Sequence, residues 1–515
     1  MIKEQLLKSY ESVKSSKNEK FTLEIEKINV LVYENSIHKY DEYLFFIGVT
    51  ENNKNLFIYS DSKSELLNNF DGSIILKSEN EVIKKSDFTH KNVLELQKIF
   101  DFTVSKVIGL KNSFGFGDRI GTANPAHLRS LSVNPDFIPV LAQQSIRELT
   151  RTQREAEDVM DAAVWAVMQE GFTTGFGADA DHLKTTDDID RMVKAGYKMF
   201  TFDPNEHVVN EADSISVDDL KEYVKNLKWK NDEATDAVIN RYSNEVIEIN
   251  NELKLAPSEE DTLRAFVKYG KSILFINKMN NYLRSTYPKW DVEVEVSVDE
   301  TESVTTPFEH YFMVNELTLL NVDIISLAPR FIGDFEKGID YIGDLEIFKT
   351  EYIKHLAITE YFGNYKISLH SGSDKFDVYK TIGSLKRGVT HVKTAGTSYL
   401  EALRVVATVD VKLFGEILDF SRKHFEVEKK TYHISADINK VLSADSYKDE
   451  ELKDLLNQND ARQVFHVTFG LVLTIKDDAN NYIYRNRIYK CLEENEDLHY
   501  EYLTKHFEKH LLPFK

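Results

Sequence analysis

Val292-Glu-Val-Glu-Val-Ser-Val-Asp-Glu300 alternates valine with polar residues and ends in two carboxylates. Successive side chains of a β-strand point to opposite faces, so the four valines share one face while Ser297 and Asp299 share the other. We expect the valines to pack against helices, which leaves Ser297 and Asp299 facing the axis of a barrel. The stretch therefore predicts a parallel strand that brings polar groups to its C-terminal end.

Seven further segments have the same character: they are short and apolar, and they end in polar residues. An amphipathic stretch follows several of them, and this alternation builds parallel βαβ units. Eight units with no ninth favour a closed (β/α)8 barrel of the α/β class over an open doubly wound sheet. In chain order the predicted strands are Ser113 to Asp118, Phe137 to Gln143, Thr174 to His182, Lys198 to Asp203, Val292 to Glu300, Val322 to Arg330, Tyr365 to His370 and Val389 to Thr394.

The chain has 515 residues, more than the roughly 250–300 at which a single core stops growing, so we expect regions added to the barrel. Residues 1–105 hold short β-like runs separated by Asn, Asp and Ser clusters and predict a strand-rich accessory region. The barrel is assigned to residues 106–405, with a helical insertion at residues 205–288 after the fourth strand. Residues 406–515 are expected to form a mixed C-terminal extension.

Composition narrows the class of partner. The net charge of −21 repels phosphate backbones and anionic lipid heads, so neither nucleic acid nor a membrane is expected to bind. No apolar run approaches the ~20 residues of a membrane helix. The N-terminus lacks a signal-peptide pattern and Cys491 is the only cysteine, which fits a reducing cytoplasm. We expect a small-molecule partner, and a homo-oligomer is compatible with the sequence.

The predicted strand ends are rich in ionisable residues, and in this fold the C-terminal strand ends carry the active site. His182 ends the third strand and His370 ends the seventh, with carboxylates at the ends of the third and fifth. Imidazole and carboxylate together form a normal ligand set for Mn, Co, Ni or Zn. The plainer alternative makes both histidines hydrogen-bonded residues of the barrel rim, but their position favours metal ligation.

A third ligand is less clearly marked. His310 is our candidate because it lies near the expected top of the barrel, with Asp299 and Glu336 as alternatives. Its neighbour Glu309 closes the sequence Thr306-Pro-Phe-Glu309, a capping-box pattern with proline at the first helical position. We therefore assign Glu309 to helix capping ahead of catalysis.

A glycine-rich segment tests whether the chain binds a nicotinamide cofactor. Gly115-Phe-Gly-Asp-Arg-Ile-Gly121 approaches the dinucleotide fingerprint, but its third glycine comes one position too late. No acidic residue closes a second strand about 20 positions later. We therefore expect no nicotinamide site.

Short motifs lie at successive strand ends from about residue 113 to about residue 400, and their order and placement make them specific. Together they resemble the tagaturonate epimerase family. The motifs are Ser113-Phe-Gly-Phe-Gly-Asp-Arg119 with the Asn-Pro-Ala-His turn ending at His127, Asp181-His-Leu-Lys184, Ser297-Val-Asp-Glu-Thr301, Phe308-Glu-His310, Leu327-Ala-Pro-Arg-Phe331 and Leu369-His-Ser-Gly-Ser-Asp-Lys375.

The resemblance implies an isomerase that interconverts D-tagaturonate and D-fructuronate in hexuronate catabolism with the help of a divalent metal. The two sugar acids differ at carbon 4, two positions from the ketone, so simple enolisation cannot invert that centre. Transient oxidation would require a nicotinamide cofactor. Retro-aldol cleavage, followed by addition to the other face of the aldehyde, needs only a metal and an acid/base pair, and we favour it.

Under this hypothesis the site residues fall into groups by role. His182, His310 and His370 hold the metal. Asp181 and Glu300 are the base and the acid that remove and return a hydroxyl proton, because carboxylates in a partly dry barrel mouth can be tuned toward neutral pH.

The carboxylate of a sugar acid also needs cations around it. We assign this role to Arg330, Lys375 and Lys393, since the loops after strands seven and eight of this fold often bind anions.

Two other functions are compatible with the same residues. One is a metal-dependent aldolase or aldose–ketose isomerase that acts on another sugar or sugar acid. The other is a sugar-acid sensor without catalysis. The number of ionisable residues at the strand ends argues against a sensor, because such groups are costly to hold together.

Overall fold

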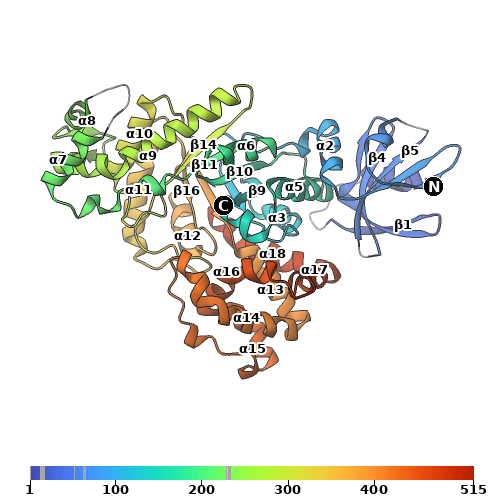
Figure 1. The fold of residues 1–515 in the computed structure, drawn as a ribbon. Helices are drawn as coiled ribbons and strands as arrows, with labels where there is room; N and C mark the ends of the chain where they lie inside the picture. The colour runs from blue at the N-terminus through green and yellow to red at the C-terminus, as the bar shows by residue number, and fades with distance from the viewer. Residues whose placement is uncertain (1, 12–17, 52, 62–64, 228, 230–233) are drawn as a thin grey trace.

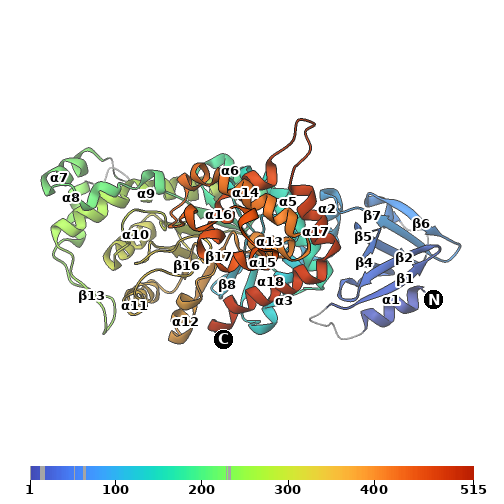
Figure 2. The ribbon, with the colours of Figure 1, turned by 90° about the horizontal axis from the view of Figure 1, so that it is seen from below.

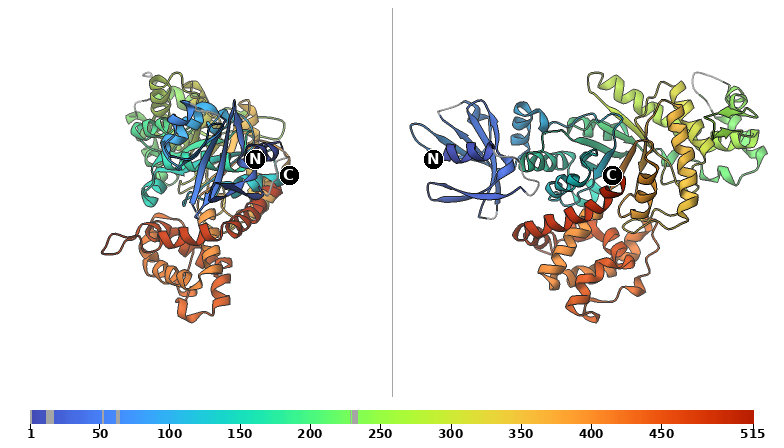
Figure 3. Two further views of the ribbon diagram at one scale, coloured as in Figure 1. Left: turned by 90° about the vertical axis from the view of Figure 1, so that its right-hand side faces the viewer. Right: turned by 180° about the vertical axis from the view of Figure 1, so that it is seen from behind.

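The fold is elongated, with a barrel at its centre. The computed structural model describes residues 2–11, 18–51, 53–61, 65–227, 229 and 234–515. Figure 1 shows the N-terminal sheet at one end of the molecule, two helices of the insertion at the other end, and the C-terminal helices below the barrel. The two views of Figure 3 show the same arrangement from the side and from behind.

Eight parallel strands close into a barrel in the order β10-β11-β14-β15-β16-β17-β8-β9. Each corresponds to one predicted strand, so the (β/α)8 barrel is confirmed. Val294, Val296 and Val298 of the fifth strand are buried in the hydrophobic core, on the face predicted for them. The strands are β8 (Ser113–Phe116), β9 (Ile138–Ser145), β10 (Gly177–Leu183), β11 (Met199–Phe202), β14 (Glu293–Ser297), β15 (Ser326–Ala328), β16 (Lys366–Leu369) and β17 (Thr390–Thr394).

Helices follow the strands and cover the barrel. One of them begins with the cap that the sequence suggested, the box between Thr306 and Glu309, where each side chain binds the backbone N–H of the other residue. The capping role predicted for Glu309 is therefore confirmed. These helices are α3 (Asn124–Ser130), α4 (Ile146–Thr152), α5 (Ala156–Glu170), α6 (Thr186–Lys194), α9 (Glu259–Thr286), α10 (Pro307–Leu319), α11 (Leu345–Tyr361), α12 (Phe376–Leu385) and α13 (Thr397–Val409).

The N-terminal region is an antiparallel sheet of seven strands, in the order β1-β2-β4-β5-β7-β6 with β3 beside β4. Helix α1 (Ile2–Tyr10) covers one face through Leu6. The other face joins the core of the barrel, where α2 (His90–Ile99) packs against α5. The strands are β1 (Lys20–Ile25), β2 (Ile28–Tyr33), β3 (His38–Tyr40), β4 (Tyr43–Thr50), β5 (Asn53–Ser60), β6 (Ser73–Lys77) and β7 (Val82–Ser86).

The insertion after β11 is mainly helical, as predicted. Helices α7 (Val217–Asn226) and α8 (Thr235–Tyr242) pack against α9. A short hairpin of β12 (Ile247–Glu248) and β13 (Lys254–Leu255) joins α8 to α9. The insertion lies at the end of the molecule opposite the N-terminal sheet (Figure 1).

The C-terminal extension differs from the mixed region that we predicted. Residues 406–515 are all described, and they form helices with a single isolated β-bridge between Lys476 and Tyr482. Helix α16 (Asn459–Thr474) is largely buried, and it shares a core with α13 and with α14 (Val411–Glu428). Figure 2 shows these helices stacked across the barrel. They are α14 (Val411–Glu428), α15 (Asp449–Asp454), α16 (Asn459–Thr474), α17 (Arg485–Glu494) and α18 (Glu496–Leu511).

Helix length and apolarity also bear on membrane insertion. Among the helices that the structure describes, none is both long and apolar enough to cross a bilayer.

Candidate active site

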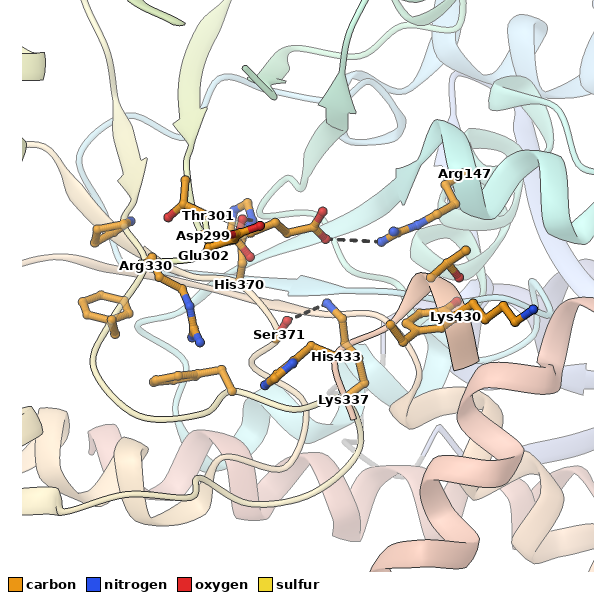
Figure 4. A pocket seen from close by; sticks show the side chains of 16 residues that line it. Arg147, Asp299, Thr301, Glu302, Arg330, Lys337, His370, Ser371, Lys430 and His433 are labelled. Atoms are coloured by element: carbon orange, nitrogen blue, oxygen red, sulfur yellow. Dashed lines mark hydrogen bonds and ion pairs between the residues drawn. The ribbon is translucent and has the colours of Figure 1, made fainter. Parts of the chain in front are cut away.

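An open cavity of about 600 Å³ lies at the C-terminal ends of strands β14, β15 and β16. In Figure 4, Arg147 lies on one side of this cavity and Arg330 on the other, with Lys337 between them. Residues 430–433 of the C-terminal extension close part of its rim. A smaller, deeper cavity adjoins it and shares Arg147, Lys337 and His370 in its lining.

Two histidines and an aspartate meet at this deeper cavity. Asp181, His182 and His370 each offer one ligand atom, and these atoms lie within 4.8 Å of one another. The two imidazole rings are 5.1 Å apart and nearly perpendicular. We call these three residues the barrel-mouth group, and the predicted convergence of His182 and His370 is present.

A bulge in β10 places two consecutive residues in the same cavity. Ala180 of β10 pairs with Phe200 of β11, but the next pair is Leu183 with Phe202. Three residues of β10 therefore span the same length as two residues of β11. At the bulge His182 adopts a positive φ of 52°, a conformation that is uncommon for residues other than glycine. Without the bulge, the pleat would direct Asp181 and His182 to opposite faces.

His370 is held from below by a carboxylate inside the barrel. Its Nε2 lies 2.7 Å from Oε1 of Glu295, so the ring N–H donates to that buried carboxylate. Its Nδ1 lies 3.3 Å from both Ser297 and Asp299. This arrangement orients the imidazole, because a donor bond at one nitrogen fixes the role of the other.

Lys393 is buried at the deeper cavity, where carboxylates surround its ammonium group. Its Nζ lies 2.6 Å from Asp179, 2.8 Å from Asp181 and 2.6 Å from Glu295. An ammonium group with three carboxylate partners has no free charge for a further anion. The structure therefore shows Lys393 pairing carboxylates inside the barrel, and its predicted role in substrate binding stays a prediction.

The buried charges shift one another's pKa values. Burial alone would lower the pKa of His182, but Asp181 and Asp203 outweigh it and raise that pKa to about 10. Burial raises the pKa of Asp179 to about 6 despite the nearby Lys393. Burial opposes ionisation of Asp181 too, yet His182 and Lys393 hold its pKa below the usual value. The site thus carries a strong negative field.

The donor set at the barrel mouth fits a divalent cation. Two imidazoles and a carboxylate match the ligands that Mn, Co, Ni and Zn prefer. Asp203 lies 3.4 Å from Nδ1 of His182 and Asp299 lies 3.3 Å from Nδ1 of His370, so a carboxylate flanks each imidazole. Oε2 of Glu295 is buried without a hydrogen-bond partner among the described residues, while its Oε1 pairs with Lys393 and His370.

The larger cavity contains the other predicted residues that remain candidates. Glu300 lines it and lies 3.5 Å from Arg147, with both side chains about two-fifths exposed. Arg330 lines the opposite wall, where it donates to the carbonyl of Gly333 at 3.2 Å. Lys337 donates to the hydroxyl of Ser371 at 2.5 Å. Cations therefore surround the cavity on more than one side.

His310 lies apart from the barrel-mouth group. It is fully buried on α10, where its Nδ1 lies 2.8 Å from His355 and its Nε2 contacts the hydroxyl of Tyr365. Both ring nitrogens are therefore engaged away from the cavity, and burial holds the pKa of His310 well below its usual value. The structure therefore does not bring His310 to His182 and His370 as predicted, because the first turn of α10 directs it between helices. Asp181 is the third residue that meets the two histidines.

Lys375 and Glu336 also have structural partners. The Nζ of Lys375 is buried and donates to the main-chain carbonyls of Glu336, Ile339 and Ser373. The structure therefore does not direct this ammonium group to the substrate cavities, where we had predicted it. Burial also lowers the pKa of Lys375 to about 7. The Oε2 atom of Glu336 accepts hydrogen bonds from Ser435 and Gln463 of the C-terminal extension, and Glu336 is not among the residues that line either cavity.

A second set of one aspartate and two histidines lies between the loop after β16 and α18. Asp374, His506 and His510, which we call the C-terminal group, also bring their ligand atoms within 4.8 Å. However, Nε2 of His510 accepts from the backbone N–H of Asp374 at 3.0 Å, and its Nδ1 faces the carbonyl of His506 at 3.1 Å. Arg462 binds the Asp374 carboxylate at 2.6 Å. This group is satisfied internally and holds the loop that follows His370.

Several residues of the site were not singled out from the sequence. Glu295 was signalled by the alternation of β14, because it precedes Ser297 on the inward face. The sequence did not indicate Arg147, because β9 continues to Ser145, two residues beyond the predicted strand end. The residues that follow the strand were therefore assigned too early in the chain. No sequence signal indicated that residues 430–433 would reach the cavity.

The fold and these groups define a (β/α)8-barrel enzyme with its candidate site at the C-terminal strand ends. A model of the tagaturonate epimerase family matches residues 33–513. The chain belongs to the tagaturonate epimerase family, and it is an isomerase.

Individual relatives agree with this assignment. A tagaturonate/fructuronate epimerase of Thermotoga maritima is 41% identical over 480 residues, which cover 93% of this chain and 96% of that protein. A glycerol-complexed crystal structure of the fructuronate-tagaturonate epimerase of Cohnella laeviribosi has a TM-score of 0.88 at 35% identity, covering 94% of this chain and 96% of that one. The native structure of the same enzyme has a TM-score of 0.87 at 36% identity, with the same coverage.

Proposed function

We propose that this enzyme interconverts D-tagaturonate and D-fructuronate by inverting carbon 4, with a divalent metal held by the barrel-mouth group. The observation that carries the proposal is the meeting of Asp181, His182 and His370 at the strand ends of a chain that belongs to the tagaturonate epimerase family. We place the reaction in hexuronate catabolism, in the cytoplasm. The single cysteine supports that location.

The chemistry that we propose is retro-aldol cleavage and re-addition. Loss of the proton from the carbon 4 hydroxyl accompanies cleavage of the bond between carbons 3 and 4, and the bonding electrons pass to the enediolate of the ketone fragment. The aldehyde fragment rotates, carbon 3 adds to its other face, and the oxygen on carbon 4 regains a proton. Atoms and electrons balance without a redox cofactor. A divalent cation at the barrel mouth would supply a Lewis acid that polarises the ketone.

Two carboxylates handle the proton in this proposal. Glu300 lines the larger cavity and takes the proton from the carbon 4 hydroxyl. Asp181, in the adjoining cavity, lies on the side of the oxygen after rotation and passes it a proton drawn from solvent, while Glu300 releases its own proton to solvent. Because the two cavities share Arg147 and His370, a substrate in the shared part lies between the two carboxylates.

The substrate carboxylate needs cations that reach the open cavity. Arg330 keeps the role predicted for it, since it lines the open cavity. Lys337 and Arg147 take the places of Lys375 and Lys393, whose ammonium groups have internal partners. These three cations line the same cavity (Figure 4), which provides the local positive charge that a chain of net charge −21 requires.

The test is NMR of metal-reconstituted enzyme with fructuronate, beside a chelated sample. Appearance of tagaturonate only in the sample with metal supports the proposal. Accumulation of cleavage fragments would indicate an aldolase, an aldose product would indicate an aldose–ketose isomerase, and binding without turnover under any metal would indicate a sensor. Each of these three results contradicts the proposal.

The two roles open to Asp181 are separated by Asp181→Asn. If the variant keeps its metal and loses activity by about 10²- to 10⁴-fold, the loss is that of a proton-transfer group. If metal content falls together with activity, Asp181 is a ligand, and the second proton-transfer role passes to Asp299, which lines the larger cavity. Glu300→Gln is the matched control, because it is expected to keep the metal in both cases.

A further inference from the structure

A second cavity, outside the barrel, lies where three parts of the chain meet. It has a volume of about 380 Å³ and is lined by the N-terminal sheet, by α5 and by α18. Ligand pockets of proteins commonly have about 300–1,000 Å³ and often lie at such junctions. Its lining shares no residue with the cavities at the strand ends.

Three buried polar atoms of this lining have no hydrogen-bond partner among the described residues. They are Nε1 of Trp165, Oγ1 of Thr122 and Nε2 of His499. Trp165 is 7% exposed and His499 is 2% exposed, so bulk water does not compensate for the missing bonds. An indole N–H can only donate a hydrogen bond, so the N–H of Trp165 needs an acceptor atom from a molecule in the cavity.

The cations around the cavity are already neutralised. Lys54 lies 2.5 Å from one carboxylate oxygen of Glu496, and Lys20 lies 3.1 Å from the other. Lys20 also pairs with Asp497 at 2.9 Å. An anion in the cavity would therefore meet no unpaired cation, and its desolvation would not be compensated. The lining disfavours an anionic occupant.

Flat apolar side chains form much of the wall. The rings of Phe88 and Trp165 stack at 4.0 Å with an interplanar angle of 1°, which presents a planar surface. Pro125 and Val49 add apolar area. A flat ring packs on such a surface better than a branched or highly hydroxylated molecule, because its own faces are apolar.

We propose that this cavity is a binding site for a small, uncharged, flat ring compound that carries a hydrogen-bond acceptor, such as an aromatic ketone or amide. The acceptor meets the donors of Trp165 and Thr122, and the ring packs on the aromatic wall. The bound molecule contacts the sheet, the barrel helix and α18 at once, so it stabilises their packing against one another. This site is distinct from the sugar-acid site and does not depend on the proposed reaction.

The test uses three probes of similar size that differ in one property each. Acetophenone is neutral and has an acceptor, benzoate is charged, and ethylbenzene has no acceptor. The whole protein is labelled with 5-fluorotryptophan, and the three tryptophan signals are assigned by single Trp→Phe variants. Acetophenone is expected to shift the ¹⁹F signal of Trp165. Ethylbenzene should bind about fivefold more weakly and benzoate should not bind.

Two controls make the result specific. Trp290, whose Nε1 already donates to Tyr197 at 2.8 Å, should not respond to any probe. Thr122→Val should weaken acetophenone about fivefold and leave ethylbenzene unchanged, because only the acceptor uses the hydroxyl. The proposal is overturned if acetophenone produces no shift up to its solubility limit, which would mean that water alone fills the cavity. Equal binding of benzoate, or an equal response of Trp290, would also overturn it.

Discussion

The barrel-mouth group and the C-terminal group each contain one aspartate and two histidines within a few ångströms, yet the structure gives them different roles. In the C-terminal group both ring nitrogens of His510 and the carboxylate of Asp374 already have protein partners. In the barrel-mouth group all three side chains line a cavity, and the carboxylates of Asp203 and Asp299 lie beside its two histidines. Residue type alone does not separate a candidate metal site from a structural clamp.

The difference lies in which bonds remain to be made. A satisfied polar cluster holds two segments together, and its removal costs stability. A cluster with excess charge at a cavity has capacity for a ligand, and its removal costs activity. Variants of the two groups should therefore affect different quantities.

The largest expected effect comes from His370→Ala. Loss of one imidazole from the barrel-mouth group should lower activity by about 10³-fold or more and remove bound metal. Loss of a residue that only hydrogen-bonds to a metal ligand costs about 10–100-fold, and loss of the ligand itself should cost more. The melting temperature should change little. Metal content is measured by elemental analysis and activity by NMR. Full activity with normal metal content would contradict the assignment.

Asp374→Asn should produce the opposite pattern. The change removes the nearer of the two carboxylates beside the buried Arg462 and leaves only Glu401, at 3.8 Å; breaking a buried pair costs about 3–5 kcal/mol. Urea unfolding followed by circular dichroism should show this loss, while metal content at the barrel mouth stays at the level of the parent enzyme. A variant that lost its metal and kept its stability would reverse the comparison between the two groups.

Acid should weaken the C-terminal group through His510. Burial lowers the pKa of His510 from 6.5 to about 3, so the unfolded chain binds a proton between those values and the folded protein does not. This contribution to stability is complete above pH 6.5 and falls by about 1.4 kcal/mol per pH unit as the pH drops from 6.5 toward 3.

His510→Gln tests that slope. Between pH 6.5 and 5, the variant should lose stability less steeply than the parent by about 1.4 kcal/mol per unit. The remaining slope comes from other buried histidines, among them His127 and His499, whose pKa values burial lowers to about 3 and about 4. Parallel urea titrations at several pH values measure both slopes, and identical slopes would show that His510 is protonated equally in both states.

The smallest expected effect on stability is that of Glu300→Gln. Glu300 and Arg147 are both about two-fifths exposed and 3.5 Å apart, so their pair contributes less than about 1 kcal/mol. Urea unfolding should therefore leave the variant within that range of the parent, although its activity falls. A loss of several kcal/mol would assign Glu300 to structure, as for Asp374.

Much of the barrel could be predicted because strand patterns are local. The alternation in β14 and the polar ends of the other strands come from the period of the pleat, which needs no knowledge of distant residues. The same reasoning placed His182 and His370 at one end of the barrel. It failed for His310, because a helix position near the barrel top does not show which way the side chain turns.

What the sequence determined by itself was the set of eight strands, the end of the barrel where ionisable groups gather, and the family to which the motifs belong. Tertiary structure alone decided which of those groups are free. Lys375 and Lys393 look like substrate cations in the sequence, but buried carbonyl and carboxylate oxygens claim both ammonium groups. A bulge in β10 turned His182 toward Asp181 against the regular alternation. Hydrogen bonds and ion pairs between distant segments form only when the chain is folded, and they decide what remains available for chemistry.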